Sequence, residues 1–154
     1  MDNLAPFLDM ISACEGTTGP DGYRALFGYT PTNSKIFDNG YVWHPNVRVM
    51  FTQTDGTINY STAAGRYQIL FGTWARVAGK IGRKMFAPID QDAAAAELIA
   101  ETGAMPSVKS GDLQRAIDLC SPVWASLPAS TYPQPRRTLA FASDAFTSAG
   151  GALA

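Results

Sequence analysis

The sequence predicts an α+β fold, made of several helices and one small antiparallel sheet. Apolar residues in the first fifteen positions recur at helical spacing, and the same spacing returns after Ser61. Between Gly19 and Tyr60, glycine, proline, asparagine, aspartate and threonine are frequent and the apolar runs are short. The length of 154 residues predicts a single domain over residues 1–154, which would bury about 70% of the surface that the unfolded chain exposes.

The first predicted element is an amphipathic helix. Five apolar residues fall on one of its faces: Leu4, Phe7, Leu8, Ile11 and Cys14. Asn3 can cap its start, and Pro6 still lies within the first turn, where a missing N–H costs nothing. Gly16 then releases the chain from the helix.

Glu15 is the last residue of this predicted helix and neighbours Cys14 on the buried face. Partial desolvation disfavours an ionised carboxylate and raises its pKa, so we expect Glu15 to carry a proton near neutral pH, as a general acid must. The alternative is an ordinary solvated glutamate in the last turn, where the helix dipole is slightly unfavourable to it.

The middle of the chain predicts the sheet. Two runs have residues that favour β-strands: Tyr41 to Trp43 and Val47 to Thr52. A turn signal at residues 38–40 precedes the first run and another at residues 55–56 follows the second, which indicates hairpins. Aromatic residues are interspersed here. They could stack on sugar rings or pack a small core, and the sequence leaves both open.

Helical patterns follow Ser61. The first places Leu70, Trp74, Val77 and Ile81 on one face. Three further helices are expected: residues 91–102 capped by Asp90, a helix from Asp112 to about Cys120, and Pro135 to Ser148 with Leu139, Ala142 and Phe146 buried.

Composition excludes several classes of function. A net charge of −1 and a pI near 5.7 remove the broad basic attraction on which nucleic-acid binders depend. The stripe of Arg76, Lys80, Arg83 and Lys84 is expected to be a solvated face. No apolar run approaches the roughly 20 residues that span a bilayer, so we expect no membrane insertion. The chain start lacks a basic region and an uninterrupted apolar run, so we expect synthesis in the cytoplasm.

The two cysteines, Cys14 and Cys120, lie on apolar helical faces, and we expect two buried thiols in preference to one disulfide. A cysteine nucleophile would need a histidine partner. His44 is the single histidine, and its Trp-His-Pro context indicates a loop or a strand end. No cluster of residues at metal-ligand spacing is visible, so we expect neither a metal nor a cofactor.

A second informative segment covers residues 61–70, where small residues lead into Tyr67 and Gln68. Tyrosine offers a stacking face with a hydroxyl, and glutamine offers a donor and an acceptor, a combination suited to N-acetyl sugars. Gly65 would let another chain segment approach closely.

Taken together, these segments resemble the phage lambda lysozyme (endolysin) family of lytic transglycosylases. Three blocks carry the resemblance: Phe-Leu-Asp-Met-Ile-x-x-x-Glu-Gly-Thr (7–17), Ser-Thr-x-Ala-Gly-Arg-Tyr-Gln-x-Leu (61–70) and Trp-Ala-Ser-Leu-Pro (124–128). Shorter stretches agree in order: His44-Pro45, Gln91-Asp92-Ala93, Gly103-Ala104-x-Pro106, Gly111-Asp112 and residues 116–121. The similarity runs from about residue 7 to Gly151 and is weakest between Thr18 and Tyr60.

The resemblance implies a lysozyme-like architecture: a mostly helical lobe and a small antiparallel sheet that flank a substrate cleft with Glu15 at its floor. It implies cleavage of the β-1,4 bond between N-acetylmuramic acid and N-acetylglucosamine in peptidoglycan, with a 1,6-anhydromuramoyl product, for host cell lysis. Glu15 would be the catalytic residue. Ser61, Tyr67, Gln68 and Tyr132 would bind the glycan, Tyr132 from a mobile lip formed by residues 126–134. We expect a monomer that reaches the wall from the host cytoplasm through a holin.

Three alternatives remain. A hydrolytic muramidase would use the same glutamate, with Asp21 or Asp38 positioning water. A non-catalytic wall-binding module would keep the aromatic residues without depending on Glu15. A phage structural protein would use Trp43 and other aromatic residues at an interface.

Overall fold

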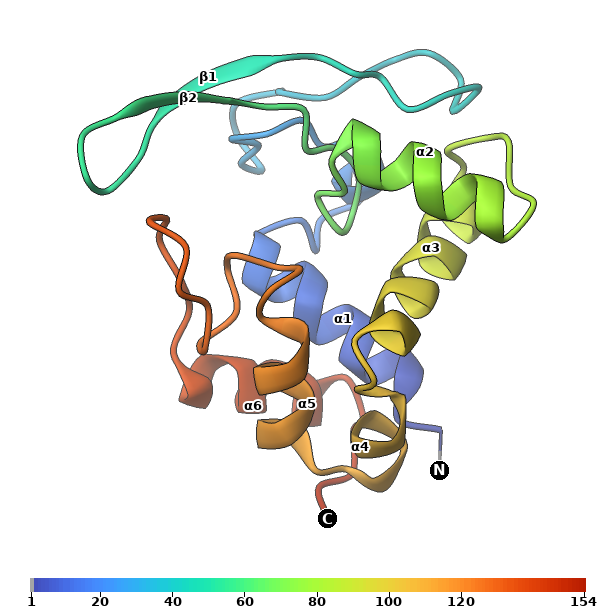
Figure 1. Ribbon diagram of the computed structural model, residues 1–154, viewed down its shortest axis with the longest axis vertical. Helices are drawn as coiled ribbons and strands as arrows, with labels where there is room; N and C mark the ends of the chain where they lie inside the picture. The colour runs from blue at the N-terminus through green and yellow to red at the C-terminus, as the bar shows by residue number, and fades with distance from the viewer. Residues whose placement is uncertain (1) are drawn as a thin grey trace. The chain divides into compact units, whose positions relative to one another are not determined.

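The computed structural model describes residues 2–154, which form two compact units. One contains the chain up to Cys14 together with Leu98–Ala154, and the other contains Glu15–Glu97. Within the described residues there are six α-helices, one short 3-10 helix and one two-stranded sheet (Figure 1). This content confirms the predicted α+β class. No helix among these residues has the length and apolar character that a membrane crossing requires.

The first unit is helical. It contains most of α1 (Leu4–Glu15), the end of α3 (Pro88–Glu101), and all of α4 (Met105–Ser110), α5 (Leu113–Cys120) and α6 (Leu139–Ser148). Its core consists of side chains that are at most 3% exposed: Phe7, Met10, Ile11, Leu98, Ile99, Val108, Ile117, Trp124, Leu127 and Phe146. The helical stripe read from the opening sequence is therefore the buried face of α1.

Asn3 does not cap α1, contrary to the prediction. Its side-chain nitrogen donates to the carbonyl oxygen of Ala152 at 2.9 Å, and its side-chain oxygen accepts from the amide of the same residue at 2.9 Å. An asparagine amide satisfies both backbone groups of one residue at once, whereas a cap would use only its oxygen. The amide of Leu4 instead donates to the Asp2 carboxylate at 3.1 Å.

The later helices of this unit agree in part with the sequence. The Asp112 side chain accepts from the Arg115 amide and caps α5, as predicted. The last helix begins at Leu139, capped by Thr138, and the predicted start at Pro135 is wrong. The Arg137 amide donates to the Ser126 carbonyl at 2.8 Å, which holds the preceding residues in the loop. Ala142 and Phe146 are buried as predicted, but Leu139 is 41% exposed.

Both cysteines are buried free thiols, as predicted. The Cys14 sulfur contacts the Met10 sulfur at 3.7 Å, and the Cys120 sulfur lies 3.6 Å from the Thr102 hydroxyl. Burial raises the pKa of the Cys120 thiol to about 11, so this thiol is a packing residue and a poor nucleophile near neutral pH.

The second unit carries the sheet. Strands β1 (Val49–Thr52) and β2 (Ile58–Ser61) lie side by side (Figure 1) and pair antiparallel. In this pairing Val49 lies opposite Ser61. Asp55 and Gly56 form the turn between them, as predicted: the Asp55 carboxylate accepts from the Thr57 amide at 3.0 Å, and Gly56 has a φ of 86°. The hairpin signal at residues 55–56 is therefore confirmed.

The predicted strand from Tyr41 to Trp43 is absent. The Asn39 side chain accepts from the Tyr41 amide at 3.0 Å and donates to the Trp43 carbonyl at 2.8 Å. Tyr41 has a φ of 59°, which lies outside the extended region. The side chain of Asn39 thus binds backbone groups that a strand would have offered to a neighbour, and the segment closes on itself as a turn.

Helix α2 (Phe71–Lys80) and the start of α3 complete this unit. Trp74 and Val77 of α2 are buried, as the helical pattern predicts, and Trp74 packs edge-on against the fully buried Phe86 at 4.7 Å between ring centres. Asp90 is not the cap of α3, because the helix already begins at Pro88. Asp90 instead pairs with Arg83 at 3.2 Å, so part of the predicted solvated basic stripe is engaged.

Candidate active site

Glu15 is the last residue of α1, and Gly16 leaves the helix with a φ of 76°. A positive φ favours glycine, so the helix ends where the sequence indicates. Glu15 is partly buried, while the preceding Cys14 is only 3% exposed. The partial burial expected for this carboxyl group is therefore present, and its catalytic role remains a prediction.

Thr17 fixes the segment after Glu15 to the second informative block. It is 1% exposed, and its hydroxyl donates to the carbonyl oxygen of Arg66. Gly22 packs so closely on Thr17 that a Cβ at Gly22 would collide with the Thr17 carbonyl group. Within the second unit, residues 15–17 and residues 61–70 are thus held by short, specific contacts.

Gly65 shows why the block at 61–70 needs a glycine. Its φ is 77°, its amide donates to the Ala25 carbonyl at 2.8 Å, and a Cβ there would overlap the side-chain amide of Gln91. Gln91 is fully buried and accepts from the Arg66 amide at 2.9 Å. The sequence predicts that another chain segment approaches Gly65 closely, and in the structure this segment is α3, through the side chain of Gln91.

Ser61 and Gln68, two of the predicted sugar contacts, both shape this loop. The Ser61 hydroxyl accepts from the Ala63 amide at 3.1 Å, and Ser61 is 8% exposed. Gln68 has a φ of 46°, and its side-chain nitrogen donates to the Gly65 carbonyl at 2.9 Å. Because that amide donates into the loop, its orientation is fixed, and its oxygen is the atom left to meet a ligand.

Tyr67, the third predicted contact in this loop, is only 2% exposed. Its hydroxyl donates to Asp92 at 2.7 Å, and the hydroxyl of Tyr23 donates to the same carboxylate oxygen at 2.9 Å. Burial, followed by the bond to Asp92, raises the pKa of both tyrosines, so both are neutral donors. The structure therefore shows Tyr67 as a support of the loop, and a direct contact with sugar stays a prediction.

Tyr132, the fourth predicted sugar contact, belongs to the first unit. It is 46% exposed, and its hydroxyl donates to the Pro122 carbonyl at 2.8 Å. Its loop is held by Arg136, which donates to the Ser130 carbonyl at 2.8 Å, and by the bond from Arg137 to Ser126. The predicted lip is thus a loop with fixed ends and an exposed aromatic side chain.

Comparison with known proteins identifies the relatives of this chain. The sequence matches the Endolysin family over residues 5–153. The chain belongs to the Endolysin family. This endolysin is 37% identical to the endolysin of Escherichia phage lambda, over 96% of its own length and 90% of the relative. It is 34% identical to the endolysin of Escherichia phage P2, over 97% and 93%.

Solved structures agree. The endolysin superposes on bacteriophage lambda lysozyme complexed with a chitohexasaccharide with a TM-score of 0.85 and 36% identity, covering 100% of this chain and 97% of the other. A second structure of lambda lysozyme gives a TM-score of 0.81 at 34% identity with the same coverage. The predicted resemblance to the lambda lysozyme family and the lysozyme-like fold class are confirmed. The chain is a lysozyme-type enzyme that cleaves glycosidic bonds in peptidoglycan.

His44 has a structural place in this endolysin. It is 2% exposed; its Nε2 lies 2.8 Å from the Ile69 carbonyl oxygen and its Nδ1 accepts from the Asn46 amide at 3.1 Å. Nε2 must therefore carry the proton. Burial lowers the pKa of His44, so the ring is a neutral part of the core. Residues 2–154 contain no group of three or more histidine, cysteine, aspartate or glutamate side chains that could hold a metal ion.

Sequence reasoning missed Asp92 and Thr17, which organise the loop beside Glu15. In the sequence Asp92 stands out only as part of a matching stretch, because nothing local distinguishes a carboxylate that receives two tyrosine hydroxyls from a solvated one. The adjacent polar pair Gln91-Asp92 is the signal that the sequence offers. Both side chains reach from the first turns of α3 to the segments at residues 23 and 65–67.

Proposed function

We propose that this endolysin is a lytic transglycosylase that cleaves the β-1,4 bond between N-acetylmuramic acid and N-acetylglucosamine. Glu15 donates its proton to the glycosidic oxygen as the bond from that oxygen to C1 breaks. The Glu15 carboxylate then accepts the proton of the C6 hydroxyl of the same muramic acid, whose oxygen bonds to C1. The products are a 1,6-anhydro sugar and a free hydroxyl on the leaving sugar, and Glu15 has regained its proton.

The resemblance to lambda lysozyme around Glu15 carries this proposal, and the contacts of the other carboxylates agree with it. A hydrolase needs a second carboxylate that activates water or attacks C1. The two candidates, Asp21 and Asp38, both face the guanidinium group of Arg24, at 3.7 and 3.9 Å. Asp92 receives two tyrosine hydroxyls. An attack by the substrate's own hydroxyl needs no second carboxylate, because tethering gives it a large effective concentration.

The surroundings of Glu15 suit an acid that becomes a base. Glu15 is the last residue of α1 and is partly buried, so its position on the backbone is fixed by the helix and part of its surface is shielded from solvent. In the proposed mechanism the same carboxyl group gives a proton and then takes one back. General acid–base catalysis of this kind contributes about 10²–10⁴-fold to a rate.

The glycan contacts are proposed from the resemblance and from the loop geometry. Gln68 keeps its side-chain oxygen for the N–H of an N-acetyl group, because its nitrogen is bound within the loop. Ser61 lies at the end of β2 beside this loop. Lambda lysozyme, which matches the whole of this chain, has a solved structure in complex with a chitohexasaccharide, a linear oligomer of N-acetyl sugars. We infer that this endolysin also binds a linear glycan.

Mass spectrometry of the products tests the proposal. Purified peptidoglycan is digested, and the muropeptides are analysed before and after borohydride treatment. A transglycosylase yields anhydro products that are lighter by one water and resist reduction, because their C1 is tied to O6. Glu15→Gln should lower the rate at least about a hundredfold and retain the wild-type melting temperature. Products with reducible ends would instead establish the hydrolase.

A further inference from the structure

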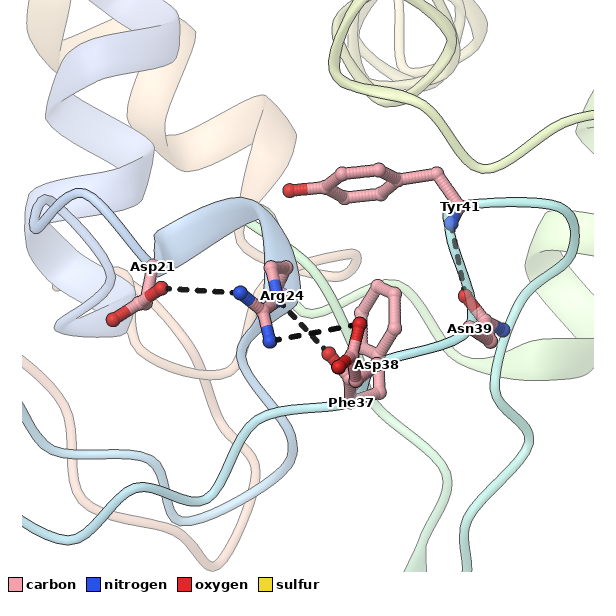
Figure 2. A network of polar contacts seen from close by, with 6 residues as sticks. All are labelled: Asp21, Arg24, Phe37, Asp38, Asn39 and Tyr41. Atoms are coloured by element: carbon pink, nitrogen blue, oxygen red, sulfur yellow. Dashed lines mark hydrogen bonds and ion pairs between the residues drawn. The ribbon is translucent and has the colours of Figure 1, made fainter.

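A cavity of about 100 Å³ lies in the second unit, beside the 3-10 helix η1 (Gly22–Arg24) and the turn at residues 38–41. Figure 2 shows its polar side chains with Arg24 at their centre. The lining residues are Arg24, Phe37, Asp38, Asn39, Gly40 and Tyr41. The proposed chemistry at Glu15 uses none of them.

The cavity presents one positive and one negative group side by side. Arg24 Nε donates to the Phe37 carbonyl at 3.0 Å, which fixes the plane of the guanidinium group. Its two terminal nitrogens lie 3.7 Å from Asp21 and 3.9 Å from Asp38. The Asp38 side chain is 89% exposed. Ion pairs this long and this hydrated are weak, so Arg24 and Asp38 can each exchange their mutual contact for one with a ligand.

Aromatic groups form the rest of the wall. The rings of Phe37 and Tyr41 meet edge to face with 5.8 Å between centres. Among residues 2–154, the Tyr41 hydroxyl makes no hydrogen bond. Burial raises the pKa of Tyr41, so the hydroxyl is a neutral donor. The cavity therefore offers apolar surface and one available hydroxyl next to its charged pair.

The cavity adjoins the loop proposed to hold the glycan. Ala25, the residue after Arg24, has a carbonyl oxygen that accepts from the Gly65 amide at 2.8 Å and, more weakly, from the Gln68 side chain at 3.5 Å. Peptidoglycan carries a short peptide on each muramic acid. A group bound at the cavity would thus lie beside a sugar bound at Gln68.

We propose that this cavity binds the zwitterionic end of a diamino acid in the peptide stem of peptidoglycan, with its carboxylate on Arg24 and its ammonium group on Asp38. The proposal rests on the proposed function, which supplies the glycan substrate. A lone carboxylate would meet Asp21 and Asp38 as well as Arg24, and a lone ammonium group would meet Arg24. An α-amino acid end carries both charges on one carbon and pairs with both residues at once.

Size agrees with most of this group. An apolar cavity of about 150 Å³ accommodates the six heavy atoms of benzene, so about 100 Å³ suits roughly four heavy atoms. An α-amino acid end consists of one nitrogen, two carbons and two oxygens, so one of these atoms would lie outside the cavity, on the side of the exposed Asp38. The methylene chain behind it would lie on the aromatic wall, and the Tyr41 hydroxyl can donate to its carboxylate.

Calorimetric titration with three synthetic probes tests the assignment. The probes are a muramyl tripeptide that ends in a diamino acid with a free α-amino acid side-chain end, the same peptide acetylated at that ammonium group, and the same peptide amidated at that carboxylate. The unmodified probe should bind about fivefold more tightly than either derivative, the scale of an exposed ion pair. Asp38→Asn should remove the discrimination against acetylation alone, and Arg24→Gln the discrimination against amidation alone.

Asp38→Asn is the primary variant, because a side chain that is 89% exposed is not needed for folding. Arg24→Lys keeps the charge if Arg24→Gln unfolds. Equal affinity for the three probes, or discrimination that survives both substitutions, would overturn the subsite. A separate titration of the wild-type protein with a peptide-free chitooligosaccharide distinguishes failure of the subsite from failure of the glycan site. If the chitooligosaccharide does not bind, the glycan site is contradicted, whatever the result with the tripeptides.

Discussion

Replacing Tyr67 by phenylalanine separates the two roles open to this residue. Tyr67 is 2% exposed, and the substitution keeps its buried ring. It removes only the hydroxyl, which donates to Asp92 at 2.7 Å. A hydrogen bond to a charged group contributes about 1.5–3 kcal/mol. Asp92 is partly exposed and can recruit water, so we expect the lower value, about 1.5 kcal/mol. For a protein of this size the melting temperature should then fall by about 3–6 °C.

The assay combines urea unfolding, thermal melting and lytic rate on one preparation. Tyr23→Phe is the matched control, because Tyr23 donates to the same oxygen at 2.9 Å from a less buried position. It should cost less. The double variant should cost more than the sum, since each single variant leaves Asp92 one tyrosine donor. Unchanged stability of Tyr67→Phe together with a large fall in lytic rate would refute this reasoning and place the hydroxyl on the substrate.

Three further predictions concern other residues. Asp21→Asn should retain most of the lytic rate, because no water needs activating; a loss as large as that of Glu15→Gln would favour the hydrolase. Tyr132→Ala should weaken glycan binding in titrations with chitooligosaccharides and barely change the melting temperature, since the side chain is 46% exposed; a buried aromatic residue would instead cost about 3–5 kcal/mol. His44 has a lowered pKa when folded, from its ordinary 6.5, so below about pH 6.5 the unfolded chain binds a proton that the folded chain resists. Below that pH, the free energy of unfolding should therefore decrease as the pH decreases, by up to about 1.4 kcal/mol per pH unit. Urea unfolding between pH 5 and 8 measures this slope, and His44→Asn should lose it because the chain has one histidine.

Local signals in the sequence were sufficient wherever the structure is decided locally. The stripe on α1, the Asp112 cap and the turn at Asp55 each depend on residues within a few positions. Asn3 and Asp90 stand at positions in the sequence that are typical of helix N-caps. Their side chains instead bind Ala152 and Arg83, respectively. Nothing near either residue identifies those partners.

The candidate site divides in the same way. Glu15 at a helix end and Gly65 at a tight approach could be read from the sequence, because each depends on its neighbours or on a backbone conformation that glycine supplies. The partners that fix them could not: Thr17 binds a carbonyl group 49 positions away, and Gln91 binds an amide 25 positions away. Arg24 and Asp38 face each other only because the intervening loop folds back.

The paired bonds between Asn3 and Ala152 join residues 149 positions apart, and this has a consequence during synthesis. On the ribosome, α1 is made first, but the segments that share its compact unit begin at Leu98 and are made last. Translation proceeds at about 5–20 residues per second, so α1 waits several seconds with its apolar face exposed. The helix that ends in Glu15 thus acquires the packing of its unit only after residues 98–154 have left the ribosome.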